Sequence, residues 1–301
     1  MQRFRSILVV VSGKDGGQAA LAEATLLATE NSATIRMVDA IPSLPDYLDL
    51  PGSEPARLHK AEQTKKLAHM EQLSAAPRAA GIDVTYELMR GDLAEKTVDR
   101  VIKNGHDLVL KSAEQPSGMS QRLFGTAGHR LFRKCPCPVW IIKSDSYKQR
   151  QHLLVAVDPL PLEQKRSPLN IKIMELGASL ATQSQCALHA VYVWPPWARK
   201  KGSELNRDRD GIPGKAGYVA DTLQAAMLDR LIEPYKASVS KLHTHLLTGQ
   251  PGDCIVELAG QLDADLLIMG TISRSQPRLF SIGSTAEFVL NNVNCSVLAV
   301  K

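Results

Sequence analysis

The sequence lacks any apolar run long enough to cross a membrane. None of its 301 residues belongs to a stretch of eighteen consecutive apolar residues, which is the least that a transmembrane helix needs. The first residues, Met-Gln-Arg-Phe-Arg-Ser, also lack the apolar core of a signal peptide. We therefore expect a cytoplasmic protein that has no membrane partner.

Charge of one sign is also scarce. The formal net charge is only +5, and no block of five like charges occurs. The densest basic patch, Arg199-Lys200-Lys201, is followed closely by Glu204 and Asp208. Nucleic-acid binding usually needs a concentrated basic surface, so we expect no nucleic-acid partner.

Metal and redox motifs are poorly represented as well. The five cysteines include no C-x-x-C pair, and Cys135 and Cys137 only flank a proline before an apolar run. Small residues leading into a strand are the favoured interpretation, with a redox or metal pair as the alternative. His243 and His245 are two residues apart and would share one face of a strand, but no further ligand is evident nearby.

What the chain does contain is a globular composition with ample core, 44% hydrophobic and 22% charged. Its length suggests two domains. In the first half, β-branched apolar runs alternate with amphipathic stretches, which predicts strands alternating with helices. The expected strands are Ser6–Val11, Thr34–Ile41, Val84–Met89, Asp107–Leu110 and Val139–Lys143, and the expected helices are Gln18–Asn31, Arg57–Ala80 with Pro77 ending or bending it, Ala94–Asn104 and Gly125 to about Arg133.

The second half repeats this order. His152–Asp158 corresponds to Ser6–Ser12, and Asp265–Met269 corresponds to Asp107–Lys111. Further matching segments are Ala187–Pro195 with Thr34–Pro42, His245–Gly249 with Glu87–Gly91, and Cys295–Lys301 with Cys137–Lys143. The extra residues of the second copy fall in expected loops, where added length costs little.

Strands separated by helices require a parallel sheet that is covered on both faces. In such doubly wound sheets, ligands bind beyond the carboxyl ends of the strands. The loops after Asp158, Val193 and Met269 would line that rim in the second half. The apolar last strands, Val139–Lys143 and Val297–Lys301, suggest that the halves pair about a pseudo-twofold axis, and a further homodimer stays open.

One stretch, Leu266–Thr285, has the chemistry of an anion site. A buried strand ends at Gly270, a basic loop follows, and Gly283-Ser284-Thr285 opens a helix. Free backbone N–H groups at a helix start attract phosphate, and glycine permits its close approach. The alternative is that these residues merely punctuate a strand and a helix.

Both halves resemble domains of the universal stress protein family, in its tandem-domain branch. The resemblance rests on Val-Asp158, Gly249, Leu-Ile-Met-Gly270, Gly283-Ser284 and the final Asn-Cys-Ser-Val-Leu-Ala-Val, and it covers essentially the whole chain. It implies two Rossmann-like domains of the adenine nucleotide alpha hydrolase type, residues 1–146 and 147–301. Each would have a five-stranded parallel sheet with helices on both faces.

Nucleotide-binding members of this family carry Gly, two residues, Gly, nine residues, Gly, then Ser or Thr. The second half keeps the spacing with Gly270, Gly283 and Ser284, but Ser273 replaces the middle glycine. In the first half the corresponding positions are Ser112, Gln115, Gly125 and Thr126, so two of the three glycines are absent. The aspartate after the first strand is Asp158 in the second half and Ser12 in the first. We therefore expect no nucleotide in the first domain.

The resemblance implies a non-enzymatic stress-response protein that binds an adenine nucleotide, most plausibly ATP with Mg²⁺, in its second domain. Asp158 and Met269 would flank the adenosine, and Arg274 would neutralise phosphate charge. The full expected ligand-binding set is Asp158, Val193, Met269, Gly270, Ser273, Arg274, Gly283, Ser284 and Thr285. No metal site of protein ligands alone is expected.

Other functions stay open. A nucleotide-free interaction protein with unknown protein partners would instead take an apolar ligand in the degenerate rim pockets. The loop Ser12–Gly17 partly resembles that of ATP pyrophosphatases, but Lys14 and Gly17 depart from that pattern. A hydrolase or nucleotidyl transferase would also need a base or nucleophile, and none can be identified.

Overall fold

The structure is a computed structural model that describes residues 4–12, 16–43, 53–114, 124–143, 150–159, 167–194, 216–271 and 282–301. The chain divides into two compact units. The first comprises the residues up to 147, and the second comprises most of the residues from 148 onward. Each unit is described here by itself.

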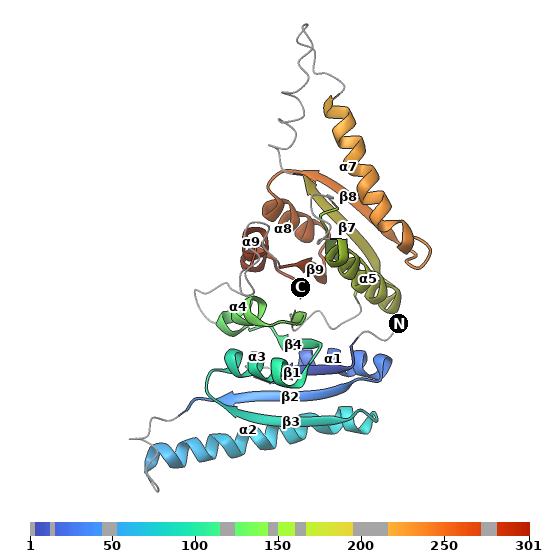
Figure 1. The fold of residues 1–301 in the computed structure, drawn as a ribbon. Helices are drawn as coiled ribbons and strands as arrows, with labels where there is room; N and C mark the ends of the chain where they lie inside the picture. Colours follow the sequence, from blue (N-terminus) through green and yellow to red (C-terminus); the bar gives the residue numbers. More distant parts are fainter. Residues whose placement is uncertain are drawn as a thin grey trace. The chain divides into compact units, whose positions relative to one another are not determined.

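The first unit is a parallel sheet with helices between its strands, in the order β3-β2-β1-β4-β5 (Figure 1). Helix α1 packs on β1 and β4, α2 runs along β3, and α3 packs on α4. The elements are β1 (Ser6–Val10), α1 (Gln18–Asn31), β2 (Thr34–Ile41), α2 (Glu54–Ala79), β3 (Val84–Arg90), α3 (Leu93–Asn104), β4 (Leu108–Ser112), α4 (Gly125–Lys134) and β5 (Val139–Ile142).

The second unit repeats this topology, with the parallel strand order β8-β7-β6-β9-β10. Helix α5 packs on β6, β7 and β9, and α8 packs on β7 and α9. The elements are β6 (His152–Ala156), α5 (Ser167–Ser184), β7 (Ala187–Trp194), α7 (Ala216–Ile232), the 3₁₀ helix η2 (Glu233–Tyr235), β8 (Leu242–Thr248), α8 (Pro251–Gln261), β9 (Leu266–Gly270), α9 (Ser284–Asn292) and β10 (Ser296–Val300). The predicted tandem α/β fold is confirmed.

Helices on both faces bury the central strands completely, which is why those strands read as unbroken apolar runs. Leu8, Leu154 and Ile268 are fully buried. The helices lie close to the sheet. A Cβ on Gly177 of α5 would come within 2.5 Å of Val155 Cγ1, so only glycine permits the observed approach.

Several element limits differ slightly from the sequence expectation, and two of these differences have a clear physical context. Helix α2 continues two residues past Pro77 and ends at Ala79. Pro77 lies in the last turn, where its missing N–H removes one helical hydrogen bond, and the helix ends two residues later. Strand β4 extends to Ser112, beyond the predicted Leu110, because Lys111 lies inside the strand although its charge interrupts the apolar run. None of the described helices is both long and apolar enough to span a bilayer.

Candidate functional site

The candidate site lies at the carboxyl end of the second unit's sheet, where β6 and β9 are neighbours. The register pairs Ala156 with Met269, so the residues that follow each strand reach the same rim. Asp158, two residues past Ala156, therefore comes to the rim level with Thr271, and its role toward a ligand stays a prediction. Trp194 ends β7 at this edge, and Val193, the residue before it, is buried.

Asp158 is held in place by the first turns of α5. Its backbone N–H donates to Asn170 Oδ1 at 3.1 Å, and Asn170 Nδ2 donates back to the Asp158 carbonyl at 2.6 Å. Asn170 is buried, so both hydrogen bonds are shielded from water. The two bonds fix the direction in which the chain leaves β6, and sequence reasoning did not identify Asn170.

Gly270 ends β9 with an ordinary negative φ, so its need for glycine is one of space. A Cβ at this position would come within 2.9 Å of Leu169 Cδ2 and 3.6 Å of Ile173 Cδ1, both on α5. The absence of a side chain therefore lets the strand end pack against α5. Met269, the residue before it, is buried among the strands.

The loop that joins β9 to α9 is closed at its base by a backbone hydrogen bond. Gly283 N–H donates to the Thr271 carbonyl at 3.0 Å, and Thr271 N–H donates to the Val300 carbonyl at 3.1 Å. These bonds anchor the start of α9 to the carboxyl ends of β9 and β10. Ser273 and Arg274, the two predicted phosphate ligands within this loop, lie outside the described residues.

The amino terminus of α9 has the geometry of an anion site. Gly283 is the N-cap residue, with φ −67° and ψ 148°, and no side chain caps the helix. The first helical hydrogen bond goes from Glu287 N–H to the Gly283 carbonyl, so the N–H groups of Ser284, Thr285 and Ala286 precede the helical ladder. Ser284 is exposed and Thr285 is half-buried, so both backbone and hydroxyl donors can meet a ligand.

A buried hydroxyl adds a further donor beside this helix start. Thr271 is 1% exposed, and its Oγ1 has no hydrogen-bond partner among the residues whose placement is described. A buried hydroxyl without a partner costs free energy, about 1–3 kcal/mol in mutational data. Its place between the last residue of β9 and the loop to α9 makes it a candidate ligand contact, which sequence reasoning missed.

The corresponding position of the first unit is filled by the protein itself. Gly125 opens α4 with φ +55°, and a Cβ on it would overlap the Glu114 carboxylate. That carboxylate pairs with the buried Lys111, whose Nζ lies 3.1 Å from Glu114 Oε1. Ser112 is also engaged, since its Oγ accepts from Ala20 N–H at 3.2 Å. An internal negative charge at this helix start disfavours a phosphate there.

Four histidines gather on one face of β6, β7 and β8, outside the rim site. His189 contacts His152 at 3.1 Å and His245 at 3.0 Å between ring nitrogens, and it stacks on His243. Burial and then the three neighbouring imidazoles lower the pKa of His189 to about 4. Sequence reasoning paired only His243 and His245, because His152 and His189 come from distant strands. No group suited to a metal ion occurs among the described residues.

The two cysteines of Cys-Pro-Cys are both buried, with their Sγ atoms 3.5 Å apart. Cys135 is the C-cap of α4, and Cys137 comes two residues before β5. The hydrogen bond with Cys135 and burial raise the pKa of Cys137, which disfavours the reactive thiolate. This environment agrees with small residues that lead into a strand.

Comparison with known proteins now gives the family. The model of the universal stress protein family matches the chain twice, over residues 3–143 and 149–301. The chain belongs to the universal stress protein family. Universal stress protein E of Escherichia coli K12 is 26% identical over 305 residues, which cover all of this chain and 95% of that protein. The protein of the same name from Photorhabdus laumondii is 24% identical, with 100% and 96% coverage.

Solved structures have the same fold. A functionally unknown protein of Pseudomonas aeruginosa PAO1 superposes with a TM-score of 0.72 at 21% identity, covering all of this chain and 93% of that one. A universal stress protein of Archaeoglobus fulgidus gives a TM-score of 0.64 at 16% identity. These likenesses confirm the fold of two universal stress protein domains in tandem, and the family supports a role in the stress response.

Proposed function

We propose that this protein acts in the stress response by binding an adenine nucleotide, ATP with Mg²⁺, at the rim of its second domain. The observation that carries the proposal is the uncapped start of α9, with Gly283 as N-cap and the buried Thr271 hydroxyl beside it. These groups supply donors for phosphate oxygens, and the acids nearby among the described residues are Asp158 and, in the first turn of α9, Glu287.

The contrast between the two domains supports this assignment. In the first domain, the Glu114 carboxylate lies against Gly125 at the start of α4. In the second domain the counterpart of Ala113, the residue before Glu114, is Thr271, and no side chain among the described residues caps the helix start. We therefore propose one nucleotide site in each chain, with the first domain as its structural partner and without a catalytic step.

Titration calorimetry with Mg-ATP tests the proposal. In the Gly283→Asp variant, the new carboxylate would cap α9 and compete with the phosphates, so the helix stays stable while affinity falls about tenfold to a hundredfold. The matched control is Gln261→Glu, which adds the same charge on the exposed end of α8. Unchanged binding by Gly283→Asp, or no heat from the unmodified protein, would contradict nucleotide binding at α9.

A second candidate, an apolar ligand in the degenerate first domain, is favoured by one observation. A cavity of about 480 Å³ lies where β2 and β3 end, lined by Ala40, Pro42, Leu93 and three small or polar residues. If calorimetry with ATP shows no heat, this cavity becomes the preferred site. Slow loss of ATP measured against a protein-free control would instead indicate hydrolysis.

A further inference from the structure

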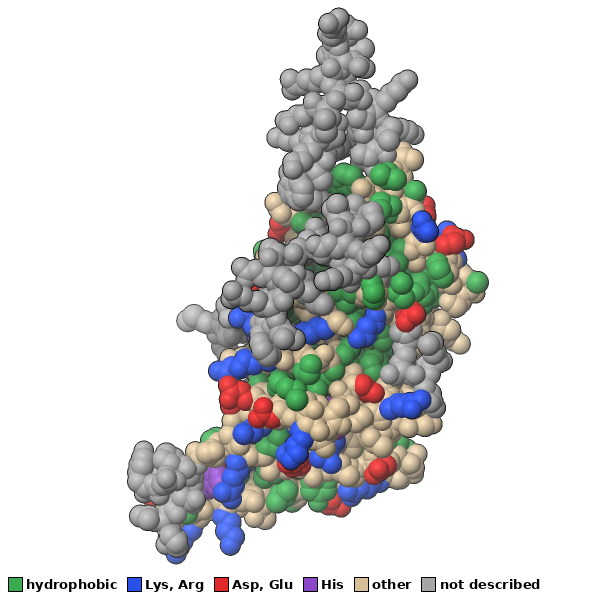
Figure 2. All heavy atoms as spheres, in the orientation of Figure 1, with side chains coloured by type: hydrophobic (Ala, Val, Ile, Leu, Met, Phe, Trp, Pro, Cys, Tyr) green, Lys and Arg blue, Asp and Glu red, His purple; other side chains and the backbone are tan. Residues whose placement is uncertain are grey.

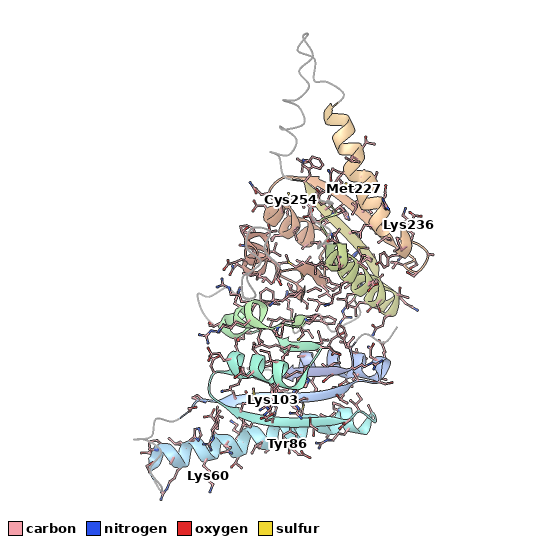
Figure 3. All side chains as sticks on the ribbon, in the orientation of Figure 1. Lys60, Tyr86, Lys103, Met227, Lys236 and Cys254 are labelled. Carbon is pink, nitrogen blue, oxygen red and sulfur yellow. The ribbon has the colours of Figure 1, made fainter. Side chains whose placement is uncertain are left out.

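A groove of about 380 Å³ lies in the first unit between β3 and α3. Its β3 wall consists of residues 87–90, and its α3 wall includes Lys96, Arg100 and Lys103. Figure 3 labels Lys103 on α3 and Tyr86 on β3, and Figure 2 shows lysine and arginine side chains beside acidic ones on the visible face. The groove shares no lining residue with the cavity at the rim of this unit.

The groove carries an excess of positive charge. Four of its lining residues are cationic, and only Glu87 and Asp99 are acidic. Both acids are already engaged: Asp99 lies 3.7 Å from Lys96 Nζ, and Glu87 pairs with Arg100 and with Arg36, which lies outside the groove. Arg90 and Lys103 are exposed, and neither has an ion-pair partner among the described residues. The unmatched charge favours an acidic ligand.

The backbone of β3 offers hydrogen bonds in the same place. Ile35 N–H donates to the Asp83 carbonyl, and Gly91 N–H donates to the Ile41 carbonyl, so the odd-numbered residues of β3 face β2. The N–H and C=O groups of Leu88 and Arg90 therefore point to the outer side of the sheet. β3 is the terminal strand of this unit, and the described strands give it no partner other than β2.

One side chain of α2 protects the first half of this edge. Arg78 of α2 donates through Nε and Nη2 to the Val84 carbonyl at 3.3 and 3.2 Å, and its guanidinium stacks over Tyr86. Such coverage is a usual way of blocking strand addition at a sheet edge. No described residue donates a hydrogen bond to the carbonyl of Leu88 or Arg90 in the same way, and these two residues line the groove.

The second unit supplies an internal comparison. Gly249 is the counterpart of Gly91, and an added Cβ would meet Cys254 there, as it would meet Lys96 at Gly91. When this correspondence is continued through both units, none of the four cations of the groove has a cationic counterpart in the second unit. Arg90, Lys96, Arg100 and Lys103 become Thr248, Cys254, Leu258 and Gln261. The fold therefore does not require a basic groove, and the charge is a property of the first unit alone.

We propose that the outer edge of β3 and the basic groove bind an extended acidic segment of a partner protein. The segment adds to the sheet beside Leu88 and Arg90 through backbone hydrogen bonds, as in other cases of strand addition. Its carboxylates pair with Arg90 and Lys103, which gives charge selectivity. Arg78 limits the addition to the second half of the strand.

Fluorescence anisotropy with the full chain tests this proposal. The probe is a labelled peptide of about ten residues in which Glu alternates with Val, long enough to cover the edge. We expect saturable binding that weakens with salt and falls about tenfold or more in the double variant Arg90→Glu, Lys103→Glu. The matched control, Arg230→Glu with Lys236→Glu on exposed positions of the second unit, should bind as the unmodified protein does.

A second peptide separates strand addition from simple charge attraction. The same sequence with methyl groups on the alternate backbone nitrogens that would face β3 keeps every carboxylate but loses the N–H donors to this strand. Its binding should therefore be lost. Equal binding of both peptides, equal loss in the two double variants, or no binding of the unmethylated peptide would each overturn the proposal. ATP titration of Arg90→Glu, Lys103→Glu distinguishes this site from the rim site, since its nucleotide affinity should not change.

Discussion

Glu114 shows how one side chain can make equivalent loops of the two units differ in their capacity to bind an anion. Its carboxylate lies against the Cα of Gly125 and is paired with the buried Lys111. The pair is only partly shielded, because the Glu114 side chain is 43% exposed, so its contribution to stability is modest. Its greater consequence is local, because it places an internal carboxylate at the start of α4, whereas no side chain caps the start of α9.

At this scale we predict that Gly125→Ala destabilises the first unit by about 1–3 kcal/mol. Alanine would have to adopt the left-handed φ of +55°, and its Cβ would overlap the Glu114 carboxylate. Gly81→Ala is the matched control. Gly81 has φ +80° but nothing within 4 Å of its Cβ position, so that variant isolates the backbone cost of about 1 kcal/mol. Urea unfolding measures both. An equal loss in the two variants would show that Glu114 does not restrict Gly125.

A second prediction at the residue scale concerns Asn170. Asn170→Ala removes both hydrogen bonds to the Asp158 backbone, so we expect a loss of about 1–3 kcal/mol in unfolding free energy and weaker nucleotide binding. Asn291→Ala on α9 is the control, because its side chain makes one exposed bond to the Glu287 carbonyl. Full retention of nucleotide affinity by Asn170→Ala would show that the position of Asp158 does not matter for the ligand.

At the scale of elements, three neighbouring strands of the second unit bring four histidines into contact. Each strand contributes by register: His189 of β7 pairs with His243 of β8, and Leu154 of β6, opposite His189, is two residues from His152. All four side chains consequently lie on one face. Burial is the main cost of protonating His189, and a positive charge on its ring also lies against the other three imidazoles.

This arrangement predicts an acid-sensitive second unit. The pKa of His189 is about 4 in the folded chain, below its ordinary 6.5, so protons bind the unfolded state more tightly. The stability that the folded chain gains from keeping His189 neutral is fully present above pH 6.5. It is lost as the pH falls toward 4, by at most about 3 kcal/mol. His189→Gln should flatten this pH dependence, and His59→Gln on α2 should leave it unchanged. Parallel pH curves for His189→Gln and the unmodified protein would contradict the prediction.

At the scale of the whole molecule, the two units have the same topology but different rims, so a ligand should act on one of them. Hydrogen exchange measured with and without Mg-ATP should show protection near Asp158, Thr271 and the first turn of α9, and none in residues 4–143. At a ligand concentration of about 100 times Kd, the second unit should gain about 2.7 kcal/mol. Protection confined to the first unit would reverse the assignment of the two domains.

Much of the fold follows from the sequence, because periodicity and repetition are local signals. The parallel αβ order, the repeat of residues 1–146 in 147–301 and most element limits were readable from apolar runs and turn residues. The strand was predicted to end at Leu110, since the charge of Lys111 interrupts the apolar run and the run itself does not show that this side chain is buried and paired with Glu114. The pairing of the two domains about a pseudo-twofold axis stays a prediction.

The sequence by itself determined which residues recur at glycine-and-serine spacing after β9, and therefore which unit keeps the better anion motif. Tertiary structure alone decided what surrounds those residues: Asn170 on Asp158, Glu114 on Gly125, the histidines of three strands and the basic groove beside β3. The physical reason is separation along the chain. A motif consists of residues that are close in the sequence. The charge, burial and free volume at a site depend on segments that only the folded sheet brings together.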